Sequence, residues 1–172
     1  MKKTASLLAG VLAVGLLALP AAHASAAPSA VPSVPECGNA DLRAGFGDAD
    51  AGMSHVFGRI RLANVSGHSC WLRGYGGLSF VGHGDGTQVG RAAARTKSPT
   101  PRLVLAPGQR AVSAVSMVST GPYSRRVCRP EHVDGLRVYV PDATESQFVP
   151  LPTTVCSNPR LRILWHQAYR AA

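Results

Sequence analysis

The chain has 172 residues, with 18 Lys and Arg against 9 Asp and Glu, and its formal net charge is +9. This length predicts one ordinary domain with a sizeable core, and it argues against a multidomain assembly. No segment after residue 26 approaches the roughly 18 consecutive apolar residues that a membrane-spanning helix needs.

The N-terminus has the pattern of a secretory signal peptide. Lysines at positions 2 and 3 precede an apolar run over residues 7–19, and small residues follow at 22–26 (Ala-His-Ala-Ser-Ala). We therefore predict a signal peptide over residues 1–26, cleaved near Ala24 to Ala26, and a secreted, extracellular protein with no membrane span after cleavage. A signal helix that is retained as an anchor is the alternative.

A linker and one domain are predicted next. Residues 27–36 are almost all Pro, Ala, Ser and Val, which is typical of an extended tether. The domain is expected over residues 37–170. It contains four cysteines without Cys-x-x-Cys spacing, and in an exported chain this predicts two disulfides rather than a zinc site. Three pairings are open, of which we favour the sequential one, Cys37 with Cys70 and Cys128 with Cys156.

Short alternating segments separated by Gly and Pro predict an all-β protein. Turn signals stand at Gly84-Asp85-Gly86 and Pro107-Gly108, and residues 91–95 fit one helical turn. This spacing favours an immunoglobulin-like antiparallel β-sandwich with two disulfides. The expected strands are residues 55–62, 78–81, 88–91, 103–105, 110–118, 136–140 and 161–165.

The stretch NVSGHSCWLRGYGGLSF, residues 64–80, concentrates the most chemically expressive side chains. In an extended strand Trp71, Arg73 and Tyr75 would share one face, opposite Cys70 and Leu72. This face is a candidate ligand-contact stripe on which a sugar or base would stack. The alternative, which we favour, is that the two aromatic rings are buried against a loop or the other sheet.

Motifs for catalysis or metal binding are weak in this sequence. The segment 82–86 (Gly-His-Gly-Asp-Gly) lacks the helix start of a phosphate loop and the oxygen ligands of a calcium loop. The histidines have no helical i, i+4 pair, and no Gly-x-Ser-x-Gly motif is present. We therefore expect no enzyme, no cofactor and no metal site. A small secreted hydrolase or metal-dependent enzyme, assembled across strands, is the alternative.

Two motifs resemble a known family. Residues 64–75 (Asn-Val-Ser-Gly-His-Ser-Cys-Trp-Leu-Arg-Gly-Tyr) resemble the N-x-S-G-x-x-C-x-L-x-G-Y signature of the domain of unknown function 4232 family, and residues 105–111 resemble its L-x-P-G-x-x-A turn. Gly76 departs from the proline that this family usually has there. The resemblance implies an exported, mostly actinobacterial β-sandwich protein of uncharacterised role, and it transfers no catalytic residue.

Charge gives the remaining functional indication. After residue 26 the chain has 15 Arg, one Lys and 9 acidic residues, a net charge of +7, and the arginines are scattered in sequence. We therefore expect a monomeric binding or interaction module of the cell envelope or extracellular space, with an anionic envelope polymer or another exported protein as partner and no specific nucleic acid. We expect the attraction to be diffuse and to fade with added salt.

Overall fold

The computed structural model describes residues 33–172, and most of these residues lie in strands. The predicted signal peptide (1–26) and most of the predicted linker (27–36) lie outside this range. The elements are β1 (Leu42–Gly52), β2 (His55–Asn64), β3 (Cys70–Arg73), β4 (Gly77–Gly82), β5 (Thr87–Val89), β6 (Ala94–Arg95), β7 (Arg102–Leu105), β8 (Arg110–Val118), α1 (Arg125–Cys128), β9 (Pro130–Tyr139), β10 (Ser146–Cys156), β11 (Leu164–His166) and β12 (Arg170–Ala171).

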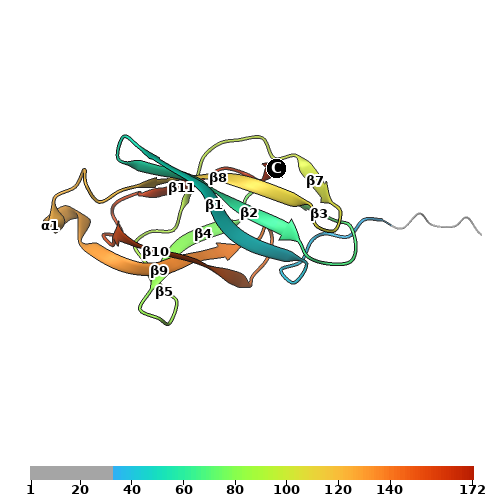
Figure 1. Ribbon diagram of the computed structural model, residues 1–172, viewed down its shortest axis with the longest axis horizontal. Helices are drawn as coiled ribbons and strands as arrows, with labels where there is room; N and C mark the ends of the chain where they lie inside the picture. The colour runs from blue at the N-terminus through green and yellow to red at the C-terminus, as the bar shows by residue number, and fades with distance from the viewer. Residues whose placement is uncertain (1–32) are drawn as a thin grey trace, which may run out of the picture. The chain divides into compact units, whose positions relative to one another are not determined.

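Two sheets form the layers of a sandwich (Figure 1). The larger sheet has the order β1-β2-β8-β11-β6, with β12 also paired to β8, and the smaller has the order β10-β9-β4-β5. A two-stranded ribbon of β3 and β7 stands at one end. The predicted all-β sandwich is confirmed. All pairs between these strands are antiparallel except β6 with β11, which is parallel.

The core lies between the two sheets because every second residue of their central strands points inward. Ile60 and Leu62 of β2 are 2% and 0% exposed, and Leu136 and Val138 of β9 are both 0% exposed. Tyr169, near the C-terminus, is also fully buried in this cluster. Burial on this scale contributes roughly 1.5 to 3 kcal/mol for each large apolar side chain.

The predicted disulfides are confirmed, with the sequential pairing. Cys37 is bonded to Cys70, which ties the start of the described chain to β3. Cys128 is bonded to Cys156, which ties α1 to the end of β10. The backbone NH of Cys37 donates to Trp71 O at 2.7 Å, and the NH of Trp71 donates to Pro35 O at 2.8 Å. The last linker residues therefore already pair with β3.

Some local expectations are wrong. Residues 91–95 form no helical turn, because Ala94 and Arg95 are extended and pair with β11. The strand expected at 161–165 begins only at Leu164. The helix α1, capped by the side chain of Ser124, and the two 11-residue edge strands β1 and β10 were not expected.

One side chain links the edges of the two sheets. Gln147 on β10 accepts a hydrogen bond from the backbone NH of Ala44 at 2.8 Å and donates to Leu42 O at 2.7 Å. Both of these backbone groups belong to β1, the outermost strand of the larger sheet. The amide of Gln147 thus occupies the open side of β1 at its start.

Candidate anion-binding site

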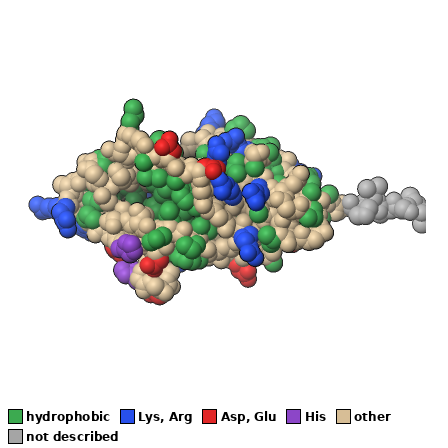
Figure 2. All heavy atoms as spheres, in the orientation of Figure 1, with side chains coloured by type: hydrophobic (Ala, Val, Ile, Leu, Met, Phe, Trp, Pro, Cys, Tyr) green, Lys and Arg blue, Asp and Glu red, His purple; other side chains and the backbone are tan. Residues whose placement is uncertain are grey.

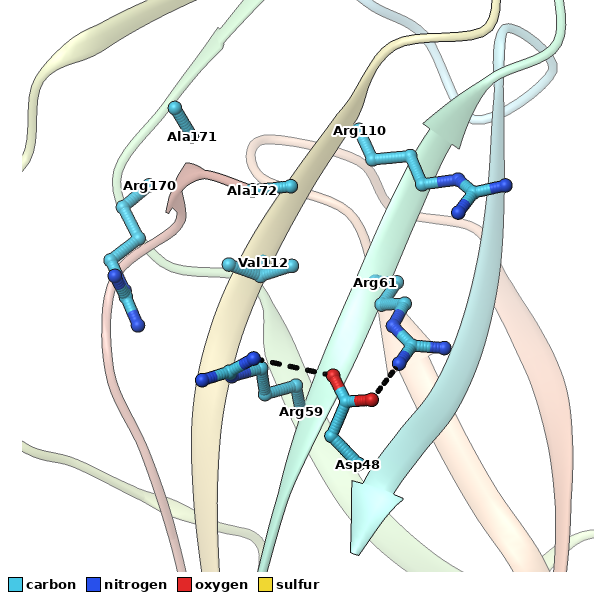
Figure 3. A pocket seen from close by; sticks show the side chains of 8 residues that line it. All are labelled: Asp48, Arg59, Arg61, Arg110, Val112, Arg170, Ala171 and Ala172. Carbon is cyan, nitrogen blue, oxygen red and sulfur yellow. Dashed lines mark hydrogen bonds and ion pairs between the residues drawn. The ribbon is translucent and has the colours of Figure 1, made fainter.

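Four arginines from three strands line one pocket on the outer face of the larger sheet (Figure 3). Arg59 and Arg61 alternate on β2 with the buried Ile60 and therefore point outward. The strand register places Arg61 opposite Val112 of β8, and Val112 opposite Arg170 of β12. The pairing of distant strands, rather than sequence proximity, thus creates the cluster.

The pocket has a volume of about 370 Å³. Besides the four arginines it is lined by Asp48, Val112, Ala171 and Ala172. The fourth arginine, Arg110, lies at the start of β8, two residues before Val112 and on the same face. The lining side chains carry four positive charges against one negative charge, so the side chains give the pocket a net positive charge. Figure 2 shows Lys and Arg side chains gathered over β1 and β2 on the face it displays.

Asp48 is the acidic side chain within the arginine cluster. It lies in a β-bulge between Gly47 and Asp50, with a positive φ of 52°. Its Oδ2 atom is 3.3 Å from Arg59 Nη1, and its Oδ1 atom accepts a hydrogen bond from Arg61. The hydrogen bond from Arg61, and then the charges of both arginines, lower the pKa of Asp48 below its ordinary value. The carboxylate thus stays ionised and neutralises part of the cluster.

The remaining two arginines have no such partner. Within the part of the chain that the structure describes, neither Arg110 nor Arg170 forms an ion pair with an acidic side chain. Both are exposed, and in Figure 3 they lie on opposite sides of Val112. A guanidinium has only donors, and it matches the acceptor oxygens of carboxylate or phosphate in a two-pronged geometry. The arrangement can therefore accept an external anion.

Of the candidate stripe of Trp71, Arg73 and Tyr75, only the first two residues lie on the same strand, β3. Trp71 and Arg73 lie on β3 and share a face, as expected. Gly74 then adopts a positive φ of 87°, which ends the alternation before Tyr75. Trp71 is only half-buried, and the guanidinium of Arg102 from β7 lies 4.6 Å from the centre of its ring. A ligand ring would have to compete with Arg102 for this face.

Tyr75 connects a loop to the larger sheet. Its hydroxyl donates to Thr96 O at 2.9 Å and accepts from the backbone NH of Ser98 at 3.0 Å. Its ring contacts His166 edge to face, with 5.8 Å between centroids. Burial, followed by the nearby charge of Arg95, lowers the pKa of His166 from 6.5 to about 4. These contacts give Tyr75 a structural role.

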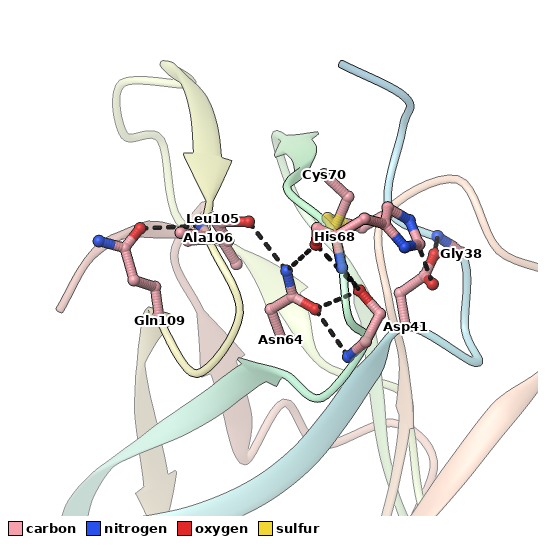
Figure 4. The surroundings of a disulfide bond; sticks show 10 residues. Gly38, Asp41, Asn64, His68, Cys70, Leu105, Ala106 and Gln109 are labelled. Atoms are coloured by element: carbon pink, nitrogen blue, oxygen red, sulfur yellow. Dashed lines mark hydrogen bonds and ion pairs between the residues drawn. A yellow bond between two sulfur atoms is a disulfide. The ribbon is translucent and has the colours of Figure 1, made fainter.

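The family motif around the first disulfide is also structural (Figure 4). Asn64 is 1% exposed, and its amide nitrogen donates to His68 O at 2.9 Å and to Leu105 O at 2.8 Å. Its amide oxygen accepts from the backbone NH of Ser66 at 2.9 Å. One side chain thus holds the 64–70 turn against β7, with Cys70 at the end of that turn.

The family model described as Domain of unknown function (DUF4232) matches residues 37–164. The chain belongs to this family. No curated protein and no solved structure matches the chain. The DUF4232 match spans both disulfides and three of the four pocket arginines, whereas Arg170 follows its last matched residue.

In this DUF4232 domain the glycine that replaces the usual proline is tightly enclosed. A Cβ atom on Gly76 would lie 2.1 Å from the carbonyl oxygen of Tyr139. The turn before β4 therefore approaches β9 more closely than any residue with a side chain would allow.

The other polar groups of the DUF4232 domain lie apart from the arginines. His83, at the β4–β5 hairpin, is 2.9 Å from Glu131 Oε1, and the NH of Gly84 donates to Asp134 Oδ2 at 2.8 Å. These contacts fasten the hairpin to β9. In residues 33–172 no group of three or more His, Cys, Asp or Glu side chains is arranged to hold a metal ion. The same residues contain no helix that is long and apolar enough to cross a membrane.

Proposed function

We propose that the domain is an exported, noncatalytic binding module that holds an anionic polymer of the cell envelope or extracellular space in its arginine pocket. The observation that carries this proposal is the lining of that pocket, in which four arginine side chains face one acidic side chain, that of Asp48. Folded chains rarely gather like charges without an opposing group, because mutual repulsion costs free energy. An external anion would relieve this repulsion.

The location of the charge favours a specific site over the diffuse attraction that the sequence suggested. Arg110 and Arg170 are far apart in the chain but line the same pocket, so one anion can contact both strands that carry them. Charge-assisted hydrogen bonds of this kind contribute about 1.5 to 3 kcal/mol each. The signal peptide predicted at residues 1–26 and the two disulfides support a ligand outside the cytoplasm.

Binding is a better proposal than hydrolysis for this pocket. The pocket is lined by one acidic side chain and no histidine, so its side chains do not supply the pair of groups that acid–base catalysis uses. Arginines instead provide fixed positive charge and hydrogen-bond donors, which suit recognition of an anion.

The test compares two double variants of equal net charge. Arg110→Gln with Arg170→Gln removes two pocket arginines, whereas Arg125→Gln with Arg126→Gln removes two exposed arginines at α1. We expect the first to weaken binding of mature protein to immobilised polyphosphate by about tenfold or more at about 0.15 M salt, and the second to leave it nearly unchanged. Equal losses in both variants would show that the attraction is diffuse and would refute the proposed site.

A further inference from the structure

A second pocket continues the arginine pocket toward the β3–β7 ribbon. Its volume is also about 370 Å³, and Arg110, Ala171 and Ala172 line both pockets. At its other side it is lined by Arg102, Val104 and Gln109. Because the two pockets share three residues they adjoin each other, and we call the two together the arginine groove.

The far end of the arginine groove is also basic. Arg102 and Arg73 lie opposite each other in the β7–β3 pairing, and both are exposed. In the described residues neither forms an ion pair with an acidic side chain. The ring of Trp71, 4.6 Å from the guanidinium of Arg102, fixes the position of this positive charge.

The arginine groove is longer than a single anion. Arg59 lies opposite Ala114 of β8, four residues from Arg110 on the same strand. At about 3.4 Å per residue this separation is about 14 Å along the sheet. Arg102 lines the second pocket together with Arg110. A small anion would therefore contact only part of the row, whereas a chain with a charge on each repeat would contact all of it.

Deepening the proposed function, and resting on it, we propose that the ligand is a linear polymer of phosphate groups that runs along the arginine groove from Arg59 past Arg110 to Arg102. Phosphate suits this row because its tetrahedral oxygens accept from arginines that approach from different strands, whereas a carboxylate has two coplanar oxygens. Trp71 acts as a positioning residue that holds Arg102 at the end of the groove.

The first experiment varies the length of the ligand. Orthophosphate, tripolyphosphate and long-chain polyphosphate are titrated into the mature protein at several salt concentrations. We expect affinity to rise steeply with chain length for wild type. Arg102→Gln should weaken binding of long-chain polyphosphate by roughly tenfold. It should also lower by about one the salt slope, which is the slope of the logarithm of the binding constant against the logarithm of salt concentration. Binding of tripolyphosphate should stay the same. Arg125→Gln, with the same net charge, should match wild type.

The role of Trp71 is tested by a pair of variants. Trp71→Ala should reproduce the smaller salt slope of Arg102→Gln for long chains, because Arg102 loses its support. Trp71→Phe keeps an aromatic face and should restore most of the wild-type slope. A merely structural role would change thermal stability without this selective loss for long chains. Trp71→Ala with an unchanged slope would refute positioning.

The second experiment separates the chemical classes. Poly(glycerol phosphate) and inorganic polyphosphate share the phosphate chain, and tighter binding of one identifies the source of the ligand. Poly-glutamate that binds as tightly as both would overturn the phosphate assignment. Arg102→Gln and Arg125→Gln could bind long chains equally well while the variant with both Arg110→Gln and Arg170→Gln still loses binding. This result would refute the proposal that the phosphate chain reaches Arg102, but the proposed function would stand.

Discussion

Gly47 provides the space in which the guanidinium of Arg61 lies. A Cβ atom on Gly47 would be 2.7 Å from Arg61 Nη1, in the path that brings this arginine to Asp48. Gly47 pairs with Arg59 across the β1–β2 ladder, and Gly45 pairs with Arg61. The absence of a side chain at Gly47 of β1 thus allows Arg61 to reach Asp48 in the pocket.

Gly47→Ala should displace Arg61 and raise the pKa of Asp48 toward its ordinary value. The reason is that the hydrogen bond from Arg61 is the largest cause of the lowered pKa. The pKa is measured by NMR titration of the side-chain carboxyl carbon of Asp48. Gly45→Ala is the matched control, because a Cβ there meets nothing within 4 Å. Equal pKa values in the two variants would contradict this role of Gly47.

Asp48→Asn should strengthen anion binding by several-fold. The carboxylate competes with any ligand for Arg59 and Arg61, and removal of its charge frees both. Asparagine tolerates the positive φ of this position, so the bulge should be kept. The measurement is the Kd for tripolyphosphate by isothermal titration calorimetry. Asp85→Asn, at the distant hairpin, adds the same charge and is the control. Weaker binding in Asp48→Asn would show that Asp48 supports the site instead.

Asn64→Ala should lower the free energy of unfolding by about 2 to 4 kcal/mol. The substitution leaves the carbonyls of His68 and Leu105 without their buried donor, and it removes the acceptor for Ser66. Chemical denaturation monitored by tryptophan fluorescence gives the value. Gln109→Ala removes an exposed side-chain amide near the same turn and should cost far less. A loss below that of the control would contradict the role of Asn64.

Stability should fall as the pH drops from about 6.5 to about 4, in part because of His166. Its folded pKa of about 4 lies below the ordinary 6.5, so the unfolded chain binds a proton that the folded one does not. The shift corresponds to about 3 kcal/mol, present above pH 6.5 and lost toward pH 4. Denaturation at several pH values should show a shallower slope for His166→Phe than for wild type. If the free energy of unfolding depends on pH equally in His166→Phe and in wild type, His166 is not the cause of the loss of stability.

The sequence predicted the fold well wherever side chains alternate clearly. The strands around Ile60 and Val138 were expected because polar and apolar residues alternate there, and the strand around Ala114 was expected because it follows the Pro107-Gly108 turn signal. Strand β1 was missed because its glycines and aspartates have low strand propensity. It forms a strand because β2 pairs with it along most of its length.

The candidate site was much harder to predict. Arg59, Arg110 and Arg170 are separated by tens of residues, and only the register of β2, β8 and β12 brings them together. The candidate stripe is not one continuous strand face, because the left-handed backbone of Gly74 ends the alternation before Tyr75. A ligand contact at Trp71, Arg73 and Tyr75 stays untested, as the less favoured of the two interpretations.

The contact of Gln147 with β1 hinders the association of one molecule with another through the edge of the larger sheet. An edge strand offers unpaired NH and CO groups on which a strand of another molecule can add, and this is a common start of aggregation. The Gln147 amide already bonds the NH of Ala44 and the CO of Leu42. A foreign strand would have to break both bonds before it could pair there, so this side chain protects one end of the exposed edge from templated self-association.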